Sequence, residues 1–526
     1  AVYTGYAMEL YVNGEFYSFM KHSQKLLLNT FALCIKIFIK ALVLLISTRL
    51  VLNELGASDY GLYNLIAGVI SLLSFLSGSL MISTQRFLSY SMGENNQDKL
   101  VSVFNVSLLI HIVIAFVLGI VFISLQPLFF NGFIDIGDAP IEVAKSVYDI
   151  MIISAIVTMS TIPYSAVINA HEDMVFFAIS EVLVIIVQLF AAIVIMFINS
   201  NLLVTYTWLM MLSIVVGFLS KFIWCKLKYK EVKISIRLAF DKYKIKEMLG
   251  FIGWNTLGSS AVLLRNQGVA IVLNYFWGTI ANAAYGIANQ INSLVLTFSS
   301  TLTTVFTPSI IQNKGAGNDE RMIFLSIFSS KLSFLLSSVM AIPVLWNLHS
   351  ILKIWLGDSL PEHTEIFTIC IIIAFLFTQL YPGINRAIYA TGQIKGYQIA
   401  ISIFLTATIP LGVIAFQVGL PVPSILWALV LSQICCFAST IYFANRHVGL
   451  DSKLFIYKNA IPSIVLCGTS ILIGNLANAI FVDARFFVFF LSLCVTLIYV
   501  FYYYKWVLNG GERNVIINLV KSVVKR

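Results

Sequence analysis

Long apolar runs separated by short polar turns occupy almost the whole chain of 526 residues. A helix that crosses the ~30 Å hydrocarbon core of a bilayer needs about 20 consecutive apolar residues, and most of the runs reach that length. The pattern therefore predicts fourteen transmembrane helices. The predicted spans are 26–52, 60–90, 100–126, 146–169, 174–198, 202–225, 249–276, 281–307, 323–345, 364–388, 397–416, 422–443, 460–480 and 486–504.

The first two runs flank a polar turn that covers residues 53–59. Gly56 and Gly61 permit tight backbone geometry where two helices reverse direction, and Asp59 is placed to cap the second helix. The turn is interpreted as structural. The connection from Trp346 to Glu365 is longer and amphipathic. If any predicted span is split or merged, we expect it to lie near 340–390.

The composition excludes a soluble protein. Hydrophobic residues make up 59% of the chain, charged residues 11%, and the mean hydropathy is +0.91, whereas soluble domains are about 25% charged. The fold class is predicted to be all-α and polytopic. None of the seven cysteines forms a Cys-x-x-Cys pair, so we predict no metal site and no disulfide. No phosphate-binding loop is present, so we predict no ATPase activity. No cofactor is predicted.

The distribution of Lys and Arg fixes the predicted orientation. With the N-terminus in the cytoplasm, most of the 33 basic residues fall in cytoplasmic segments, and Lys145, Lys353 and Arg485 fall outside. Both termini are therefore predicted to be cytoplasmic. The basic loop 226–246 is interpreted as a topology anchor that touches anionic lipid, with partner docking as the alternative.

The two halves resemble each other weakly. Val51-Leu52-Asn53 followed by Gly56 parallels Val272-Leu273-Asn274 followed by Gly278, and Pro163 parallels Pro382, at a spacing of about 220 residues. This predicts two parallel bundles of six helices with the substrate path between them. The predicted divisions are an extension (1–25), a first bundle (26–225), a basic linker (226–248), a second bundle (249–445), two additional helices (446–504) and an amphipathic tail (505–526).

The stretch with Arg49, Leu55-Gly56, Asp59-Tyr60-Gly61 and Gln85-Arg86-Phe87 closely resembles bacterial polysaccharide exporters. These are the O-antigen (Wzx-type) flippases of the multidrug/oligosaccharidyl-lipid/polysaccharide exporter superfamily. The resemblance implies alternating access in the bacterial inner membrane. The implied cargo is an oligosaccharide linked to undecaprenyl pyrophosphate, which moves from the cytoplasmic to the periplasmic leaflet. A polysaccharide polymerase and a chain-length regulator are implied as partners, besides membrane lipid.

A pyrophosphate-linked sugar needs cations in a polar cavity away from lipid. The candidates within predicted spans are Lys36, Lys40, Arg49, Arg265 and Lys331. Lys40 and Arg265 lie near mid-depth of the two helices that begin the repeats, so we expect both to face one central cavity. The alternatives are that Lys36 and Arg49 extend to the headgroups and that Arg265 binds backbone carbonyls.

Polar and acidic residues complete the set of candidates. Tyr285, Asn289 and Asn292 fall on one helical face and could bind sugar, although such residues also pack helices together. Glu181 and Asp149 are candidates for a coupling proton or sodium ion, with pairing to Lys221 as the alternative for Glu181.

Three other functions compete with the flippase. An antiporter for cationic drugs would need buried carboxylates, but intramembrane cations outnumber acids here. A membrane enzyme would need a reactive cluster, for which His349 and His363 are the only outside candidates, and a scaffold would use the basic loop. The turn His171-Glu172-Asp173 lacks zinc-site spacing and is predicted to be a solvated loop. Residues 1–20 are predicted to be an extension and not a signal peptide.

Overall fold

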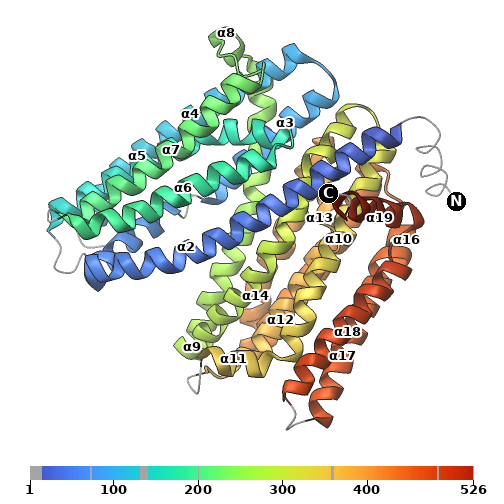
Figure 1. The fold of residues 1–526 in the computed structure, drawn as a ribbon. Coiled ribbons are helices and arrows are strands. Elements are labelled where there is room, and N and C mark those ends of the chain that lie inside the picture. Colours follow the sequence, from blue (N-terminus) through green and yellow to red (C-terminus); the bar gives the residue numbers. More distant parts are fainter. Residues whose placement is uncertain are drawn as a thin grey trace. The chain divides into compact units, whose positions relative to one another are not determined.

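The computed structural model describes residues 15–71, 74–130, 140–198, 201–356, 360–481 and 485–524 (Figure 1). These residues form helices joined by short turns, and no strand occurs among them. The predicted all-α class is confirmed. The chain divides into two compact units, which are called the N-terminal unit (residues 28–256) and the C-terminal unit (residues 257–526, together with 1–27).

The N-terminal unit is built from six long helices and the start of a seventh. Its helices are α2 (Glu15–Ser71), α3 (Ser74–Gly93), α4 (Gln97–Leu128), α5 (Ile141–Ala170), α6 (Met174–Val194) with the short 3₁₀ turn η2 (Ile195–Phe197), α7 (Leu202–Lys228), the short α8 (Ile236–Ala239), and the first part of α9 (Lys242–Gly315).

The C-terminal unit holds the start of α2, up to residue 27, and all of the chain from residue 257 within α9 onward. Its helices are α10 (Asp319–Trp346), α11 (Leu348–Leu356), α12 (Thr364–Gln379), α13 (Pro382–Thr391), α14 (Lys395–Gln417), α15 (Ser424–Val448), the short α16 (Ser452–Phe455) with the π turn η3 (Ile456–Ala460), α17 (Ile461–Ile480), α18 (Arg485–Trp506) and α19 (Gly510–Val524).

Ten of the described helices are long and apolar enough to cross a membrane, and two bent pairs raise the number to twelve if each counts as one span. One of these pairs is α12 with α13, which meet at 46° just before Pro382. The run 364–388, predicted as one span, is therefore broken. A proline at the first position of a helix fits such a restart, because its missing N–H is unpaired there in any case.

The predicted turns at Gly56 and near Gly278 are breaks inside α2 and α9, not separate loops. Gly56 has φ 75° and ψ 169°, and Gly278 has φ 74° and ψ −169°. This backbone region is essentially restricted to glycine. A single glycine thus redirects each helix, so the polar turn predicted over 53–59 is wrong in extent. The helix resumes directly after Gly56.

Each unit has its own apolar core. In the N-terminal unit, Val51 and Ile66 of α2 pack with Phe122 of α4 and the fully buried Tyr148 of α5, whose hydroxyl donates to the carbonyl of Phe122 at 2.9 Å. In the C-terminal unit, α9 packs against α12 and α15 through residues such as Leu273, Phe367 and Leu426. Helix α10 contacts α13, α17 and α18, so the two additional helices pack onto this unit.

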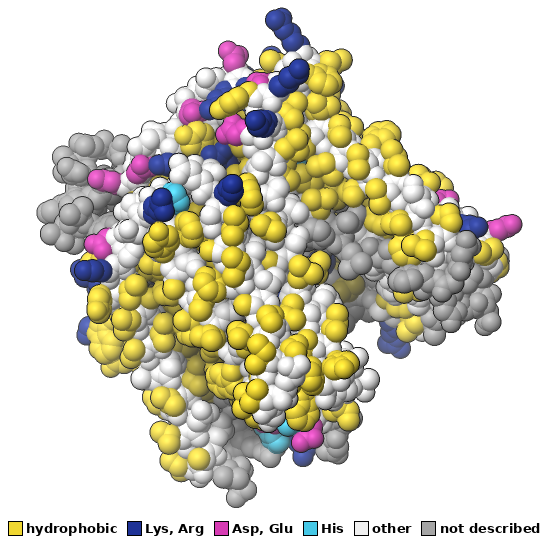
Figure 2. Space-filling view, turned by 180° about the vertical axis from the view of Figure 1, so that it is seen from behind, with side chains coloured by type: hydrophobic (Ala, Val, Ile, Leu, Met, Phe, Trp, Pro, Cys, Tyr) yellow, Lys and Arg dark blue, Asp and Glu magenta, His cyan; other side chains and the backbone are white. Residues whose placement is uncertain are grey.

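Large apolar side chains cover much of the surface. Phe116 and Ile120 on α4 are more than 60% exposed, as are Phe190 on α6 and Leu497 on α18. Figure 2 shows hydrophobic side chains over the middle of the visible face, with many of the charged side chains in its upper part. Such a surface is stable in lipid and not in water. The chain is thus a multi-pass membrane protein.

Candidate functional site

A polar cavity of about 430 Å³ lies within the C-terminal unit. Helix α9 lines it from both sides of the Gly278 break, with Arg265 before the break and Tyr285 and Asn289 after it. The break therefore returns the chain to the same cavity. Three residues that the sequence singled out are brought together here. Asn292, predicted on the same face as Tyr285 and Asn289, lines the cavity as well.

Arg265 is the only charged side chain among the described residues that line this cavity. Its Nε and Nη2 donate to Oδ1 of the adjacent Asn266 at 3.2 and 2.9 Å. None of the described acidic residues forms an ion pair with it, and the side chains that act on its charge are those of Tyr285, Cys436 and Tyr381. The neighbouring amide orients the guanidinium without neutralising it, so the charge is available to a ligand.

Helices α13, α14 and α15 supply lining residues that sequence reasoning missed. Tyr381, Tyr389 and Tyr397 line the cavity, and Gln398 Nε2 donates to the Tyr389 hydroxyl at 2.8 Å. The three tyrosines recur at intervals of eight residues, which is a signal that the sequence contained. It was missed because the run 381–397 crosses a turn and looks like two unrelated helix ends.

Two amide oxygens in the wall lack a partner. Oδ1 of Asn292 and Oδ1 of Asn385 are buried, and neither accepts a hydrogen bond from the described residues. Buried acceptors are nearly always satisfied by protein, water or ligand. Together with the tyrosine ring faces and Arg265, they make a wall that can bind hydroxyl groups, stack on sugar rings and neutralise one anionic group.

Lys331, predicted to bind cargo, lies away from this cavity. Its Nζ forms a buried ion pair with Glu512 of α19 at 2.8 Å and also donates to the carbonyl of Val507 at 2.9 Å. Lys331 is 3% exposed and Glu512 is 1% exposed. The structure thus gives the charge of Lys331 a partner from the C-terminal helix. A role of Lys331 in binding cargo stays a prediction.

The N-terminal unit brings Lys36, Lys221 and Glu181 together. Lys221 Nζ lies 2.6 Å from Glu181 Oε1, which confirms the pairing considered as the alternative for Glu181. Lys36 Nζ and Lys221 Nζ lie 5.3 and 5.0 Å from the ring centroid of Phe177, within the range of cation–π attraction. The single carboxylate therefore faces two ammonium groups, and the cluster has an excess of positive charge.

The remaining predicted residues are exposed. Lys40 and Arg49 both lie on exposed positions of α2. Asp149, on α5, accepts a hydrogen bond from Gln126 Nε2 at 2.9 Å. The shared cavity predicted for Lys40 and Arg265 stays a prediction.

The turn His171-Glu172-Asp173 is not a solvated loop. Glu172 is 4% exposed, and its carbonyl accepts a hydrogen bond from Asn29 Nδ2 at 2.8 Å. His171 contacts Glu231 and stacks on Tyr229 with ring centroids 4.0 Å apart. The prediction was wrong because these partners are far away in the sequence.

Asp173, the last residue of this turn, accepts hydrogen bonds from three side chains. Its Oδ2 accepts hydrogen bonds from Lys228 Nζ at 2.6 Å, Tyr229 at 2.8 Å and Trp224 at 3.1 Å. Burial opposes ionisation of the carboxyl group, but these donors outweigh it and lower the pKa of Asp173. In Glu231, likewise, burial acts against ionisation and the hydrogen bond with His171 prevails, lowering the pKa.

Comparison with known proteins identifies the fold. Residues 257–414 match the model of the MatE family. No curated protein is similar enough in sequence to count as a match. Solved structures do match, but at 14–16% sequence identity, a level that shows the fold alone.

Three of these structures are informative. The first is a MATE transporter in a bent conformation, with TM-score 0.71 and 14% identity over 83% of this chain and 98% of that chain. The second is an outward-facing multidrug resistance MATE family transporter of the MOP superfamily, with TM-score 0.66 and 15% identity over 81% and 96%. The third is a MOP superfamily transporter from Pyrococcus furiosus, described as having a binding pocket of reverse polarity that suggests a different function, with TM-score 0.66 and 16% identity over 82% and 96%. The fold is therefore that of MATE transporters of the MOP superfamily.

Proposed function

We propose that this protein is a flippase that moves an oligosaccharide linked to a polyprenyl pyrophosphate across the bacterial inner membrane by alternating access. The observation that carries the proposal is the cavity around Arg265. It combines one guanidinium, several tyrosines and unpaired amide oxygens, and no carboxylate occurs among its described lining residues. This composition suits a ligand with many hydroxyl groups and a negative charge.

The roles of the lining groups follow from their chemistry. A guanidinium can hold two oxygens of a phosphate at once, which a neutral donor cannot do with comparable strength. Tyr285 and Tyr389 offer ring faces to sugar rings, and Asn289 and Asn292 offer amide groups to hydroxyls. Asn289 already uses one amide hydrogen on the carbonyl of Tyr285, at 2.9 Å, which fixes its orientation.

The cluster of Lys36, Lys221 and Glu181 supports the same class of cargo. Glu181 is the acidic residue of this cluster with which a cationic drug would interact, but Lys221 already pairs with it. A site for a cationic drug would need an unpaired carboxylate. In the Pyrococcus furiosus transporter, pocket polarity has been linked to function, and by the same reasoning the Arg265 cavity argues against a cationic cargo here.

The proposed direction of transport depends on the orientation, which comes from the charge distribution. We propose that both termini and the basic loop 226–246 face the cytoplasm. A cysteine at Ser235 should then resist an impermeant thiol reagent added to intact cells. Ready labelling at Ser235, with none at an introduced cysteine at Ser58, would reverse the orientation and with it the direction of transport.

The cargo class is tested by reconstitution of the full chain into liposomes. One preparation contains a fluorescent polyprenyl-pyrophosphate oligosaccharide, and its exposure on the outer leaflet is followed by quenching. A second preparation contains a fluorescent organic cation, and its efflux is followed under a proton or sodium gradient. We expect movement of the oligosaccharide lipid and none of the cation. Gradient-driven efflux of the cation, without movement of the lipid, would replace the flippase by the antiporter.

A further inference from the structure

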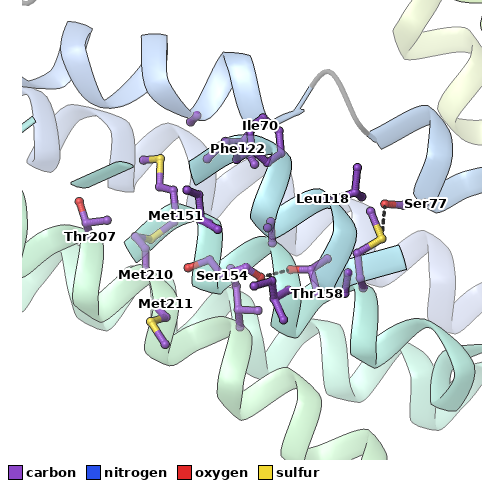
Figure 3. Close-up of a pocket in the computed structure, with 18 of the residues that line it drawn as sticks. Ile70, Ser77, Leu118, Phe122, Met151, Ser154, Thr158, Thr207, Met210 and Met211 are labelled. Carbon is purple, nitrogen blue, oxygen red and sulfur yellow. Dashed lines mark hydrogen bonds between the residues drawn. The ribbon is translucent and has the colours of Figure 1, made fainter. Parts of the chain in front are cut away.

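A second cavity lies inside the N-terminal unit, and its chemistry is the opposite of that of the Arg265 cavity. It has a volume of about 280 Å³ and lies among α2, α3, α4, α5 and α7 (Figure 3). Its wall is formed mainly by apolar side chains, among them Ile70, Leu118, Phe122 and Met151. None of the described lining residues carries a charge.

Four of the five hydroxyl groups in the wall are already used by the protein, and the fifth is that of Tyr63. Ser154 Oγ donates to the carbonyl of Ile150 at 2.9 Å, and Thr158 Oγ1 donates to the carbonyl of Ser154 at 2.8 Å. Thr207 Oγ1 donates to the carbonyl of Leu203 at 2.8 Å, and Ser77 Oγ lies 3.6 Å from Met159 Sδ. A polar ligand would lose its hydration here and gain few hydrogen bonds in return, so the cavity selects against it.

Methionines make the wall adaptable. Met151, Met159, Met210 and Met211 all line the cavity, and Figure 3 shows Met151, Met210 and Met211 grouped on one side of it. Methionine has flexible, polarisable side chains that fit ligands of variable shape. A set of four suits a chain that can bend, such as a run of methylene or isoprene groups, better than it suits one rigid ring.

The size and access of the cavity also fit a chain. A dry apolar cavity of about 150 Å³ is already large enough to bind benzene, so a cavity of this volume holds a longer hydrocarbon segment. Thr158 is exposed, so the wall opens at this side chain. Only part of a lipid would enter, and the rest would stay outside.

We propose that this cavity binds a segment of an unbranched or isoprenoid hydrocarbon chain. Two sources have this chemistry, namely the acyl chain of a membrane phospholipid and the polyprenyl chain of a lipid-linked sugar. The proposal does not depend on the transport activity, since it concerns binding alone and is measured without any flux.

The test uses the full chain in nanodiscs with two photoreactive probes in separate samples. One is a phosphatidylglycerol with a diazirine at the end of an acyl chain, and the other is a polyprenyl phosphate with a diazirine at the terminal isoprene. After illumination, the labelled positions are mapped by mass spectrometry. We expect label on 151–159 and 207–214 in clear excess over the lipid-facing residues Phe116 and Ile120 of α4.

Matched variants separate the cavity from the general lipid surface. Met210→Trp and, as a milder change, Ala155→Leu fill the cavity and should remove the excess label. Met196→Trp makes the same replacement at an exposed methionine outside the cavity and should leave it unchanged. The probe that labels the cavity identifies the source of the chain. Label spread evenly over lipid-facing residues with both probes, or an excess that survives both filling variants, would overturn the proposal.

Discussion

Gly56 and Gly278 have nearly the same left-handed backbone conformation, with φ 75° and φ 74°, at corresponding points of the two halves of the chain. Each breaks the helix that begins its half. Their sequence surroundings, Val-Leu-Asn before the glycine and Tyr-Gly after it, match as well. The agreement in backbone geometry supports the internal repeat more directly than the weak sequence likeness, because φ and ψ at these positions are not fixed by composition.

These glycines should not tolerate a side chain. In both Gly56→Ala and Gly278→Ala, the new Cβ would meet no atom within 4 Å, so the effect is backbone strain alone. We expect a destabilisation of about 1–3 kcal/mol for each, the range for non-glycine residues in this region. The measurement is the thermal unfolding temperature of the purified protein in detergent.

Neighbouring glycines provide the control. Gly61 and Gly286 also have open space around a Cβ but lack a positive φ. Alanine at either should be neutral or slightly stabilising, because alanine is the better helix former by about 1 kcal/mol. If all four variants unfold at the same temperature, the breaks do not depend on glycine.

The Lys331–Glu512 ion pair should stabilise the packing of α19 against α10. Glu512→Gln leaves the ammonium of Lys331 buried without its counter-charge, which costs about 3–5 kcal/mol in comparable cases. The double variant Lys331→Met/Glu512→Leu should recover most of this stability, and it should still transport. Thermal unfolding and reconstituted transport measure the two effects.

The exposed pair Lys314–Asp319, at 2.9 Å, is the matched control, and Asp319→Asn should cost less than about 1 kcal/mol. If the double variant folds normally and has lost transport, Lys331 contacts the cargo after all, as its position in the sequence first suggested.

Glu181 should couple transport to an ion gradient. If protonation or sodium binding at Glu181 alternates with its pairing to Lys221, Glu181→Gln should bind cargo normally but move it slowly and without gradient dependence. The measurement is the initial rate of reconstituted transport with and without an imposed proton or sodium gradient. Glu142→Gln, at an exposed position of α5 and outside the candidate set, is the control and should retain the dependence. Full gradient dependence in Glu181→Gln would exclude this residue from coupling.

The Asp173 turn should contribute stability only while its carboxylate is ionised. The pKa of Asp173 is lowered in the folded protein, so its contribution is complete above the unfolded pKa of about 4 and disappears as the pH falls through the folded value. Asp173→Asn should therefore unfold at a lower temperature than the parent at pH 7, by the equivalent of about 1.5–3 kcal/mol, which is what a hydrogen bond to a charged group contributes.

This difference should shrink when both proteins are unfolded at a pH below about 4. Asp98→Asn, at an exposed position of α4, is a control for the loss of one surface charge. A difference between parent and Asp173→Asn that is the same at both pH values would contradict the assigned role of the carboxylate.

The sequence predicted the fold well because membrane helices are encoded locally. An apolar run of sufficient length must be helical in lipid, so every predicted span has a helix at its position, apart from the residues that the structure does not describe. The breaks were harder to predict, because Gly56 and Gly278 need no polar loop to redirect the chain. The structure of the Asp173 turn could not be predicted, because Trp224 and Lys228, which donate hydrogen bonds to Asp173, are not connected to it by any local pattern.

The site was predicted only in part. Arg265, Tyr285 and Asn289 stood out because polar residues are rare in an apolar helix, and the structure brings them to one cavity. Lys331 stood out for the same reason, but its partner Glu512 lies in a tail that looked like a surface anchor. Rarity identifies a buried charge, whereas only tertiary structure shows whether another residue of the chain already neutralises it.

The central claim is that Arg265 holds the anionic group of a lipid-linked oligosaccharide, and reconstituted transport of Arg265 variants tests it most directly. Arg265→Gln should lower the rate about tenfold to a hundredfold, since a hydrogen bond to a charged group contributes about 1.5–3 kcal/mol. Arg265→Lys should recover part of the rate if a point charge suffices. Lys353→Gln, which removes an exposed cation from α11, should have no effect. Normal transport by Arg265→Gln in protein that inserts and folds as the parent does would contradict the account.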